Sequence, residues 1–131
     1  VTVYDALVVQ AGVAAGERVL VHAVGSGLGT AAAQLGRALG WYTIGTSRTE
    51  AKLEPARALG LAEGIVAEGG RFADAVRTIT GGRGVDAVLE LVGGAYVAED
   101  LSCIAPRGRI VLVGLLAGPP AHVDLATLLR K

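Results

Sequence analysis

Short apolar runs alternate along this chain with longer stretches of helical periodicity, and glycine, proline or polar residues separate them. The apolar runs predict strands over residues 18–23, 41–46, 64–67, 85–91 and 109–115. The intervening stretches predict helices over 2–10, 29–39, 50–59, 71–80 and 96–104. Pro55 falls near the first turn of its helix, where proline is tolerated, and Gly81-Gly82 ends the next one.

The strands are apolar on both faces, as Ile110-Val111-Leu112-Val113 illustrates. Strands of this kind are buried on both sides, and their alternation with helices implies a parallel sheet with right-handed crossovers. We therefore expect a three-layer α/β/α fold of the Rossmann type: a doubly wound parallel sheet of five strands in the order 3-2-1-4-5.

Composition indicates one compact unit with a core of small aliphatic residues. The 131 residues are 52% hydrophobic, with 20 glycines but one Phe and one Trp. Twelve basic and twelve acidic side chains cancel, without a basic stripe, so neither nucleic acid nor a membrane surface is an expected partner. We expect a cytoplasmic location. Cys103, His22 and His122 are too few for a Cys/His zinc cluster, and no metal site is assigned.

A glycine-rich turn joins the first strand to the first long helix. Glycines there let the backbone approach a bulky anion, and the following helix directs free N–H groups at it. The strict spacing G-x-G-x-x-G is not met, because Thr30 stands where the third glycine would fall. A tight turn without a ligand is the alternative. The phosphate-binding candidates are Gly25, Ser26, Gly27, Leu28, Gly29 and Thr30.

The end of the second strand indicates which nucleotide binds. An NAD site places an acidic residue about 20 residues beyond the glycine turn, but Thr46 is followed here by Ser47, Arg48 and Thr49, with Lys52 close behind. These hydroxyls and cations suit a 2′-phosphate, so we expect NADP(H). Alternatively, Arg48 and Lys52 are solvated surface residues, and Ser47 and Thr49 are helix caps.

The ends of the fourth and fifth strands should face the nicotinamide, because ligands of such sheets lie at the carboxyl ends of the strands. Val92, Gly93, Gly114 and Leu115 are the candidates, and both glycines could instead be plain turn residues. Glu90 could contact the cofactor or cap the sheet.

Two further residues are expected to belong to the core. We expect His22 to be a core residue bonded to backbone, and Cys103 to be a small buried hydrophobe. No Ser-His-Asp, Cys-His or paired-carboxylate arrangement stands out, so no catalytic residue is assigned.

Four ordered segments resemble the nucleotide-binding domain of the medium-chain dehydrogenases/reductases, specifically the zinc-free NADPH-dependent quinone oxidoreductases. They read RVLVHAVGSGLGTAAAQLGRALG, GTSRTEAKLEPARALG, GVDAVLELVGGAY and GRIVLVGLLAG. The opening TVYDALVVQAGVAAGERVLVHA is similar to the family's entry into this domain. The resemblance covers nearly the whole chain.

The chain departs from the family pattern at two places. With Ala23 read as the first position of A-x-x-G-x-x-G, Ser26 stands where the second glycine usually falls and Gly29 is the last. Some relatives have a Tyr after the third strand, beside the adenosine, where this chain has Val66-Ala67.

The resemblance implies that residues 1–131 are the NADP(H)-binding domain of an oxidoreductase whose GroES-like substrate domain lies outside this chain. Hydride would pass from NADPH to a quinone or enone, and the resemblance allows a homodimer. We expect the isolated chain to bind NADPH without appreciable turnover. A stand-alone NADP(H)-binding or sensor module is the alternative, and a methyltransferase is disfavoured because no acid follows the second strand.

Overall fold

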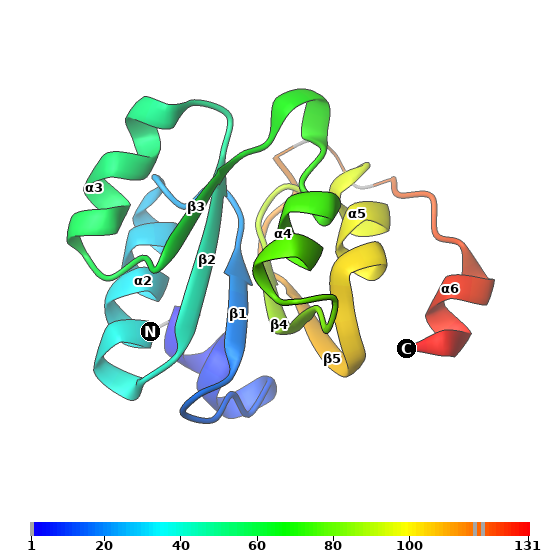
Figure 1. Cartoon of the computed structure of the whole chain (residues 1–131), viewed down its shortest axis with the longest axis horizontal. Coiled ribbons are helices and arrows are strands. Elements are labelled where there is room, and N and C mark those ends of the chain that lie inside the picture. The colour runs from blue at the N-terminus through cyan, green and yellow to red at the C-terminus, as the bar shows by residue number, and fades with distance from the viewer. Residues whose placement is uncertain (1, 117, 119) are drawn as a thin grey trace.

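Within the residues that this computed structural model describes, 2–116, 118 and 120–131, five parallel strands form one sheet (Figure 1). The strands are β1 (Arg18–Val21), β2 (Tyr42–Ser47), β3 (Glu63–Val66), β4 (Val85–Glu90) and β5 (Ile104–Leu112). Their order is β3-β2-β1-β4-β5, and each neighbouring pair is parallel. The predicted fold class and strand order are confirmed.

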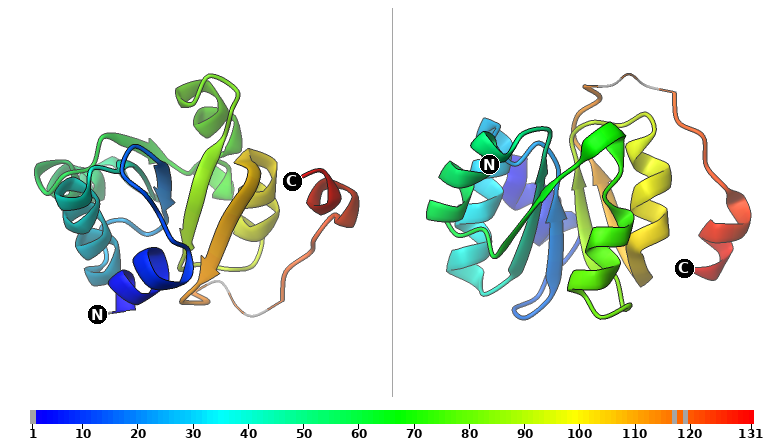
Figure 2. Two further views of the ribbon diagram at one scale, coloured as in Figure 1. Left: turned by 90° about the horizontal axis from the view of Figure 1, so that it is seen from below. Right: turned by 45° about the horizontal axis from the view of Figure 1, so that its top comes forward.

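Helices cover both faces of this sheet (Figure 2). One apolar cluster packs η1 (Asp5–Gln10), α2 (Gly27–Leu39) and α3 (Leu53–Ala58) against one face, and a second packs α4 (Ala73–Ile79) and α5 (Tyr96–Cys103) against the other. Val19 and Val21 belong to the first cluster and Leu20 to the second, as the pleat of a strand buried on both sides requires. The remaining short elements are α1 (Thr2–Tyr4), η2 (Glu50–Lys52), η3 (Glu68–Gly70) and α6 (Leu125–Arg130).

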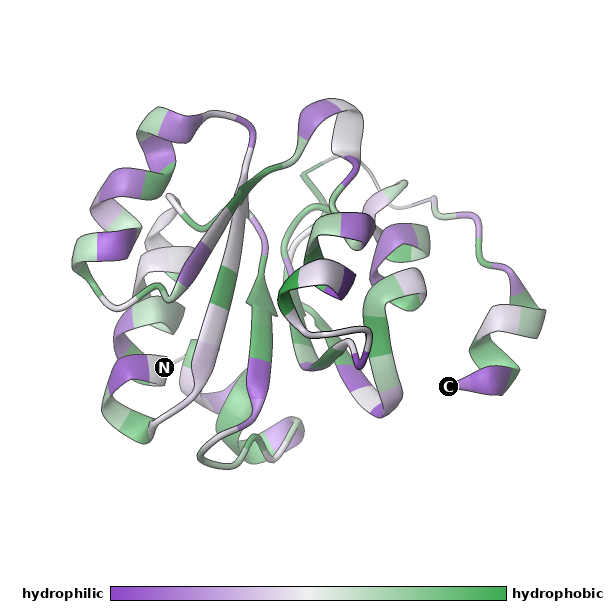
Figure 3. Cartoon of the chain, viewed as in Figure 1, coloured by the Kyte–Doolittle hydropathy of each residue, from purple (hydrophilic) through white to green (hydrophobic). Residues whose placement is uncertain are grey.

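Hydropathy follows these layers. In Figure 3, hydrophobic residues gather along β1 and β4, whereas the outer turns of α3 are largely hydrophilic. Cys103 is buried in the second cluster, as predicted, and burial raises the pKa of its thiol to about 12. No helix among the described residues is long and apolar enough to span a bilayer.

Strand β5 corrects one predicted boundary. It begins at Ile104, directly after α5, and ends at Leu112, whereas the sequence predicted a strand over 109–115. The pairing with β4 shifts between Val85 and Ala87, and Arg107 in this stretch has φ +67°. Pro106 cannot donate to the ladder, so the chain bulges out and pairs again at Arg109. Gly114 and Leu115 consequently lie in the loop beyond the strand.

Other predicted boundaries shift by a few residues. The predicted N-terminal helix divides into α1 and the π-helical turn η1, and the helix predicted over 50–59 opens with the 3₁₀ turn η2. Helix α2 begins two residues before its predicted start, because Ser26 is its N-cap and accepts a 3.1 Å hydrogen bond from the Gly29 N–H.

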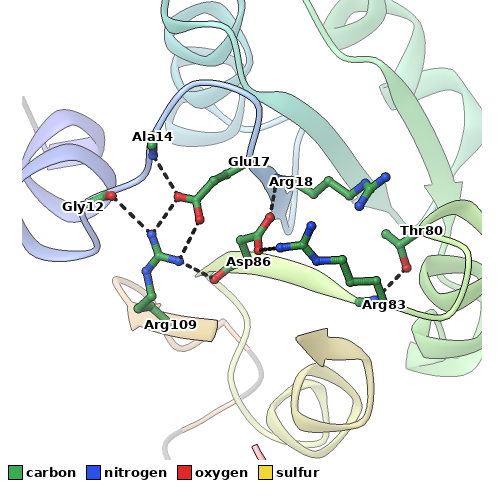
Figure 4. A network of polar contacts seen from close by, with 9 residues as sticks. Gly12, Ala14, Glu17, Arg18, Thr80, Arg83, Asp86 and Arg109 are labelled. Carbon is green, nitrogen blue, oxygen red and sulfur yellow. Dashed lines mark hydrogen bonds and ion pairs between the residues drawn. The ribbon is translucent and has the colours of Figure 1, made fainter. Parts of the chain in front are cut away.

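Arg109 joins distant segments at the amino-terminal edge of the sheet (Figure 4). Its guanidinium donates to the carbonyl oxygens of Ala11, Gly12 and Asp86 at 2.7, 3.3 and 3.1 Å, and it pairs with Glu17 at 2.9 Å. The hydrogen bond from Arg109 lowers the pKa of the Glu17 carboxyl. This network fixes the N-terminal loop against β4 and β5, at the edge opposite the carboxyl ends of the strands.

Candidate functional site

A cavity of about 810 Å³ opens at the carboxyl ends of the central strands. Five predicted site residues line it: Gly25, Ser26, Arg48, Lys52 and Val92. They come from the loops after β1, β2 and β4, which lie far apart in sequence. The crossover topology brings these loops together where the strand order reverses, the usual ligand position in such sheets.

The turn after β1 is an exposed cradle at the start of α2. Ala23 has φ +48°, a conformation that residues with a side chain rarely adopt, and its carbonyl accepts a 2.9 Å hydrogen bond from the Ser26 N–H. Gly27 is the first residue of α2, and a Cβ built on it would meet nothing within 4 Å. The turn therefore leaves open space beside the first N–H groups of the helix.

Three other predicted residues of this turn have packing roles that the structure shows directly. Gly29 is buried, and a Cβ there would lie 2.5 Å from Val24 Cα. Leu28 packs against the first apolar cluster, and the Thr30 hydroxyl donates to the Gly27 carbonyl at 3.1 Å. None of the three is among the residues that line the cavity, so their coenzyme contacts stay a prediction.

The cations after β2 lie beside the glycine turn. A Cβ on Gly25 would lie only 3.1 Å from Lys52 Cβ, so the glycine is what lets the two loops approach this closely. Arg48 and Lys52 are exposed, and in the described part of the chain no carboxylate lies within 4.0 Å of either. Both cations are free to take an anionic ligand from the cavity.

The hydroxyl residues around Arg48 differ in their surroundings. Ser47 is buried, and its Oγ accepts a 3.3 Å hydrogen bond from the Thr49 N–H, so it stabilises the turn itself. Thr49 is exposed at the N-cap position of η2, without a capping hydrogen bond from its side chain. Neither lines the cavity, and their contact with a coenzyme remains a prediction.

The loops after β4 and β5 pack tightly on one another. A Cβ on Gly93 would lie 2.9 Å from Leu115 Cδ2, and a Cβ on Gly114 would lie 2.9 Å from the Leu91 carbonyl oxygen. Both glycines thus have a packing role, and their contact with a nicotinamide stays a prediction. Leu115 is half exposed, and its neighbour Leu116 lines the cavity in its place.

Several lining residues were not predicted from the sequence. Ala67 and the 3₁₀ turn η3 after β3 form one side of the cavity, and Tyr96, at the start of α5, contributes from another. Gly69 and Gly70 both have positive φ, so this glycine pair was a recognisable signal for a turn at the site edge.

Behind the cavity lies a buried polar cluster of His22, Glu90 and Asp100. His22 was expected to bond to backbone, but its ring nitrogens lie 2.8 Å from Thr46 Oγ1 and 2.6 Å from Asp100 Oδ1. Side chains replace the expected carbonyl because α5 brings Asp100 over the end of β1. Burial lowers the pKa of His22 to about 4 and raises the pKa values of Glu90 and Asp100 to about 7.

Comparison with known proteins agrees with this geometry. A family model described as zinc-binding dehydrogenase matches residues 27–131. The chain belongs to this family. It is 36% identical over 116 residues to a quinone oxidoreductase of Pseudomonas aeruginosa, covering 88% of this chain and 36% of that protein. It is 41% identical over 103 residues to a 2-haloacrylate reductase of Burkholderia sp., covering 79% of this chain and 31% of that protein.

Solved structures place this zinc-binding dehydrogenase domain in the same group. The structure of Escherichia coli quinone oxidoreductase complexed with NADPH superposes with a TM-score of 0.89 at 32% identity, covering 98% of this chain and 40% of that one. The domain is thus of the quinone oxidoreductase type within the medium-chain dehydrogenases/reductases. It spans about a third of the length of the curated relatives it matches.

The family's description raises the question of zinc, and the buried cluster is where described residues come nearest to a ligand set. His22 Nε2 and Asp100 Oδ1 are 2.6 Å apart, a hydrogen-bond distance. Two ligands of one tetrahedral zinc, each bonded at about 2.0–2.1 Å, lie about 3.3 Å apart. The three side chains are also fully buried. The cluster therefore fits a shared proton and does not fit a zinc ion.

Proposed function

We propose that this chain is the NADP(H)-binding domain of an oxidoreductase that reduces a quinone-like or enone acceptor with NADPH. The observation that carries the proposal is the shared cavity: the open glycine turn at the start of α2 and the cations Arg48 and Lys52 line the same space. The relatives, oxidoreductases by name, favour this function over a stand-alone binding module.

The residues of the chain suit the two charged parts of this coenzyme. The Gly27 and Leu28 N–H groups, in the first turn of α2, have no carbonyl one turn earlier to accept them, and they suit a pyrophosphate. Arg48 and Lys52 suit the 2′-phosphate, which an acidic residue in their place would repel. When bound, NADPH supplies the hydride, and the protein binds, orients and excludes water.

The loops after β4 and β5 would form the nicotinamide wall of the site. Val92 and Leu116 line the cavity there, and Gly93 and Gly114 keep the two loops in close contact. The proposal assigns the protein to the cytoplasm, with which its one cysteine, a buried free thiol, is consistent, and it includes a small-molecule acceptor and a homodimer.

Titration calorimetry of the 131-residue chain with NADPH and NADH tests this function. We expect NADPH to bind more tightly than NADH. Gly27→Val should fold, because the added side chain enters open space, and should lose both nucleotides, because that space would hold the pyrophosphate. Ala38→Val, exposed near the other end of α2, is the matched control and should bind normally. Wild-type affinity in folded Gly27→Val would refute the site.

A further inference from the structure

The carboxylate of Glu90 holds the turn that follows β4. Its Oε2 accepts hydrogen bonds from the Val92 N–H at 2.8 Å and the Gly93 N–H at 2.9 Å. Val92 lines the cavity, and Gly93, with φ +72°, turns the chain away from the sheet. One carboxyl oxygen that accepts from two successive N–H groups fixes the backbone of this cavity wall.

Glu90 is itself held from behind. Its side chain is fully buried, and Oε1 lies 3.5 Å from His22 Nε2. Asp100 lies 2.6 Å from the same nitrogen, and Thr46 bonds the other side of the ring. Glu90 therefore packs against a ring that its own hydrogen bonds join to the end of β2 and to α5.

The His22 ring is fixed by packing as well as by hydrogen bonds. Its centroid lies 4.5 Å from that of Phe72 and 4.9 Å from that of Tyr96, which stands edge-on to it. Tyr96 also lines the cavity. The imidazole cannot turn without displacing these rings, so Glu90 packs against a neighbour with a fixed orientation.

Burying a carboxylate is costly, and a neutral side chain of similar size would pack there at lower cost. The Oε1 atom of Glu90 has no hydrogen-bond partner among the described residues, whereas Oε2 accepts from two backbone N–H groups. What Glu90 does satisfy completely is the pair of N–H groups in the cavity wall. The hydrogen bonds of Glu90 therefore fix the backbone of the cavity wall.

We propose that Glu90 is a positioning residue, which sets the backbone of Val92 and Gly93 for the nicotinamide half of the coenzyme while His22 and Asp100 hold it in place. The inference rests on the proposed coenzyme function. The proposal divides the site into two halves. The nicotinamide half depends on Glu90, and the adenosine half, with Arg48 and Lys52, does not.

Two ligands and two substitutions test this separation by calorimetry. NADPH occupies both halves of the site, and 2′,5′-ADP carries the adenosine and its phosphate without a nicotinamide. Glu90→Leu removes both acceptor oxygens, and we expect it to weaken NADPH about tenfold, the scale of two lost hydrogen bonds, and to change 2′,5′-ADP less than about twofold. Glu90→Gln keeps an oxygen for the two N–H groups and should restore NADPH affinity to within about twofold of wild type.

Asp86→Asn is the matched control, because Asp86 is a buried carboxylate at the other end of the same strand, bonded to the Arg18 N–H. It should bind both ligands as the wild type does. Equal weakening of both ligands by Glu90→Leu, or unchanged NADPH affinity, would overturn the inference while the proposed function stands. A wild-type chain that binds neither ligand would overturn both.

A readout that needs no ligand covers the case in which Glu90→Leu does not fold. In the NMR spectrum of the free chain, the Val92 and Gly93 amide protons should lie downfield and exchange slowly in the wild type and in Glu90→Gln. Rapidly exchanging amides at these two positions in the wild type would show that the carboxylate does not hold the turn, and would overturn the inference.

Discussion

His22 Nε2 lies 2.6 Å from Asp100 Oδ1, although the two residues are 78 positions apart, and both are fully buried. Glu90 completes the cluster. With the pKa of His22 lowered to about 4 and those of both carboxyls raised to about 7, the three groups carry no net charge near pH 6 in the folded protein.

This arrangement predicts that stability falls as pH rises from about 5 to above 7. In the folded protein the Glu90 and Asp100 carboxyls keep their protons up to about pH 7, whereas in the unfolded chain they lose them near pH 4. Their contribution to the free energy of unfolding is therefore fully present below about pH 4 and is lost as pH rises through about 7. Because the pKa of His22 is lowered, its contribution to stability rises with pH between about pH 4 and 6.5. Two groups oppose one, so the folded state holds about one extra proton near pH 6.

Asp100→Asn should reduce the slope of the unfolding free energy against pH by up to about 1.4 kcal/mol per pH unit, because it removes one of the two carboxyls that cause the slope. At pH 8 it should unfold at a higher temperature than the wild type. Urea unfolding between pH 5.5 and 8 measures the effect. Asp74→Asn, which changes a fully exposed carboxylate on α4, is the control and should keep the wild-type slope. Parallel pH profiles for wild type and Asp100→Asn would contradict the cluster's role.

Arg48 is expected to distinguish the two nicotinamide coenzymes. Arg48→Ala should weaken NADPH binding by about 1.5–3 kcal/mol, the scale of a hydrogen bond to a charged group, and leave NADH nearly unchanged. Calorimetry with both coenzymes measures the difference. Arg37→Ala removes an exposed cation on α2 outside the cavity and should affect neither. Equal losses for NADPH and NADH in Arg48→Ala would assign Arg48 to another part of the coenzyme.

Gly29 and Gly27 should respond differently to alanine, although they share one turn. Gly29→Ala forces a methyl group to within 2.5 Å of Val24 Cα and should cost about 1–3 kcal/mol of unfolding free energy, as overpacking does. Gly27→Ala enters open space in the first turn of α2 and should be neutral or stabilising by less than about 1 kcal/mol. Urea denaturation compares them, and equal midpoints would contradict the close approach of β1 and α2.

Arg109 should contribute to stability through its carbonyl partners. Arg109→Leu leaves the Ala11 and Asp86 carbonyls without their donor and Glu17 without its cation, and we expect a loss of about 2–3 kcal/mol. Arg83→Ala removes an exposed partner of Asp86 and should lower the free energy of unfolding by less than about 1 kcal/mol. Thermal and urea unfolding measure both, and a loss in Arg109→Leu no larger than in Arg83→Ala would show that the network is dispensable.

Part of the site could be predicted because its information is local. The glycine turn and the basic segment after β2 are each read from a few consecutive residues, and the parallel topology brings the ends of β1 and β2 together. Gly25, Ser26, Arg48 and Lys52 accordingly line one cavity, which Val92 after β4 also lines, and their contacts with a coenzyme stay a prediction. Leu115 does not line the cavity: β5 ends at Leu112, and in the loop beyond it the Leu115 side chain packs against Gly93.

The sequence by itself determined the alternation of strands and helices and the glycine turn, since both depend on local periodicity and backbone preference. It also indicated the parallel sheet and its strand order, because alternating strands and helices with right-handed crossovers form few arrangements. Only the tertiary structure decided that His22 contacts Asp100 and Glu90, and that Arg109 reaches Glu17. These contacts join residues many positions apart, and they depend on the register of neighbouring strands and on the rotation of α5. No pattern along the chain encodes either quantity, because side-chain packing across the whole sheet sets both.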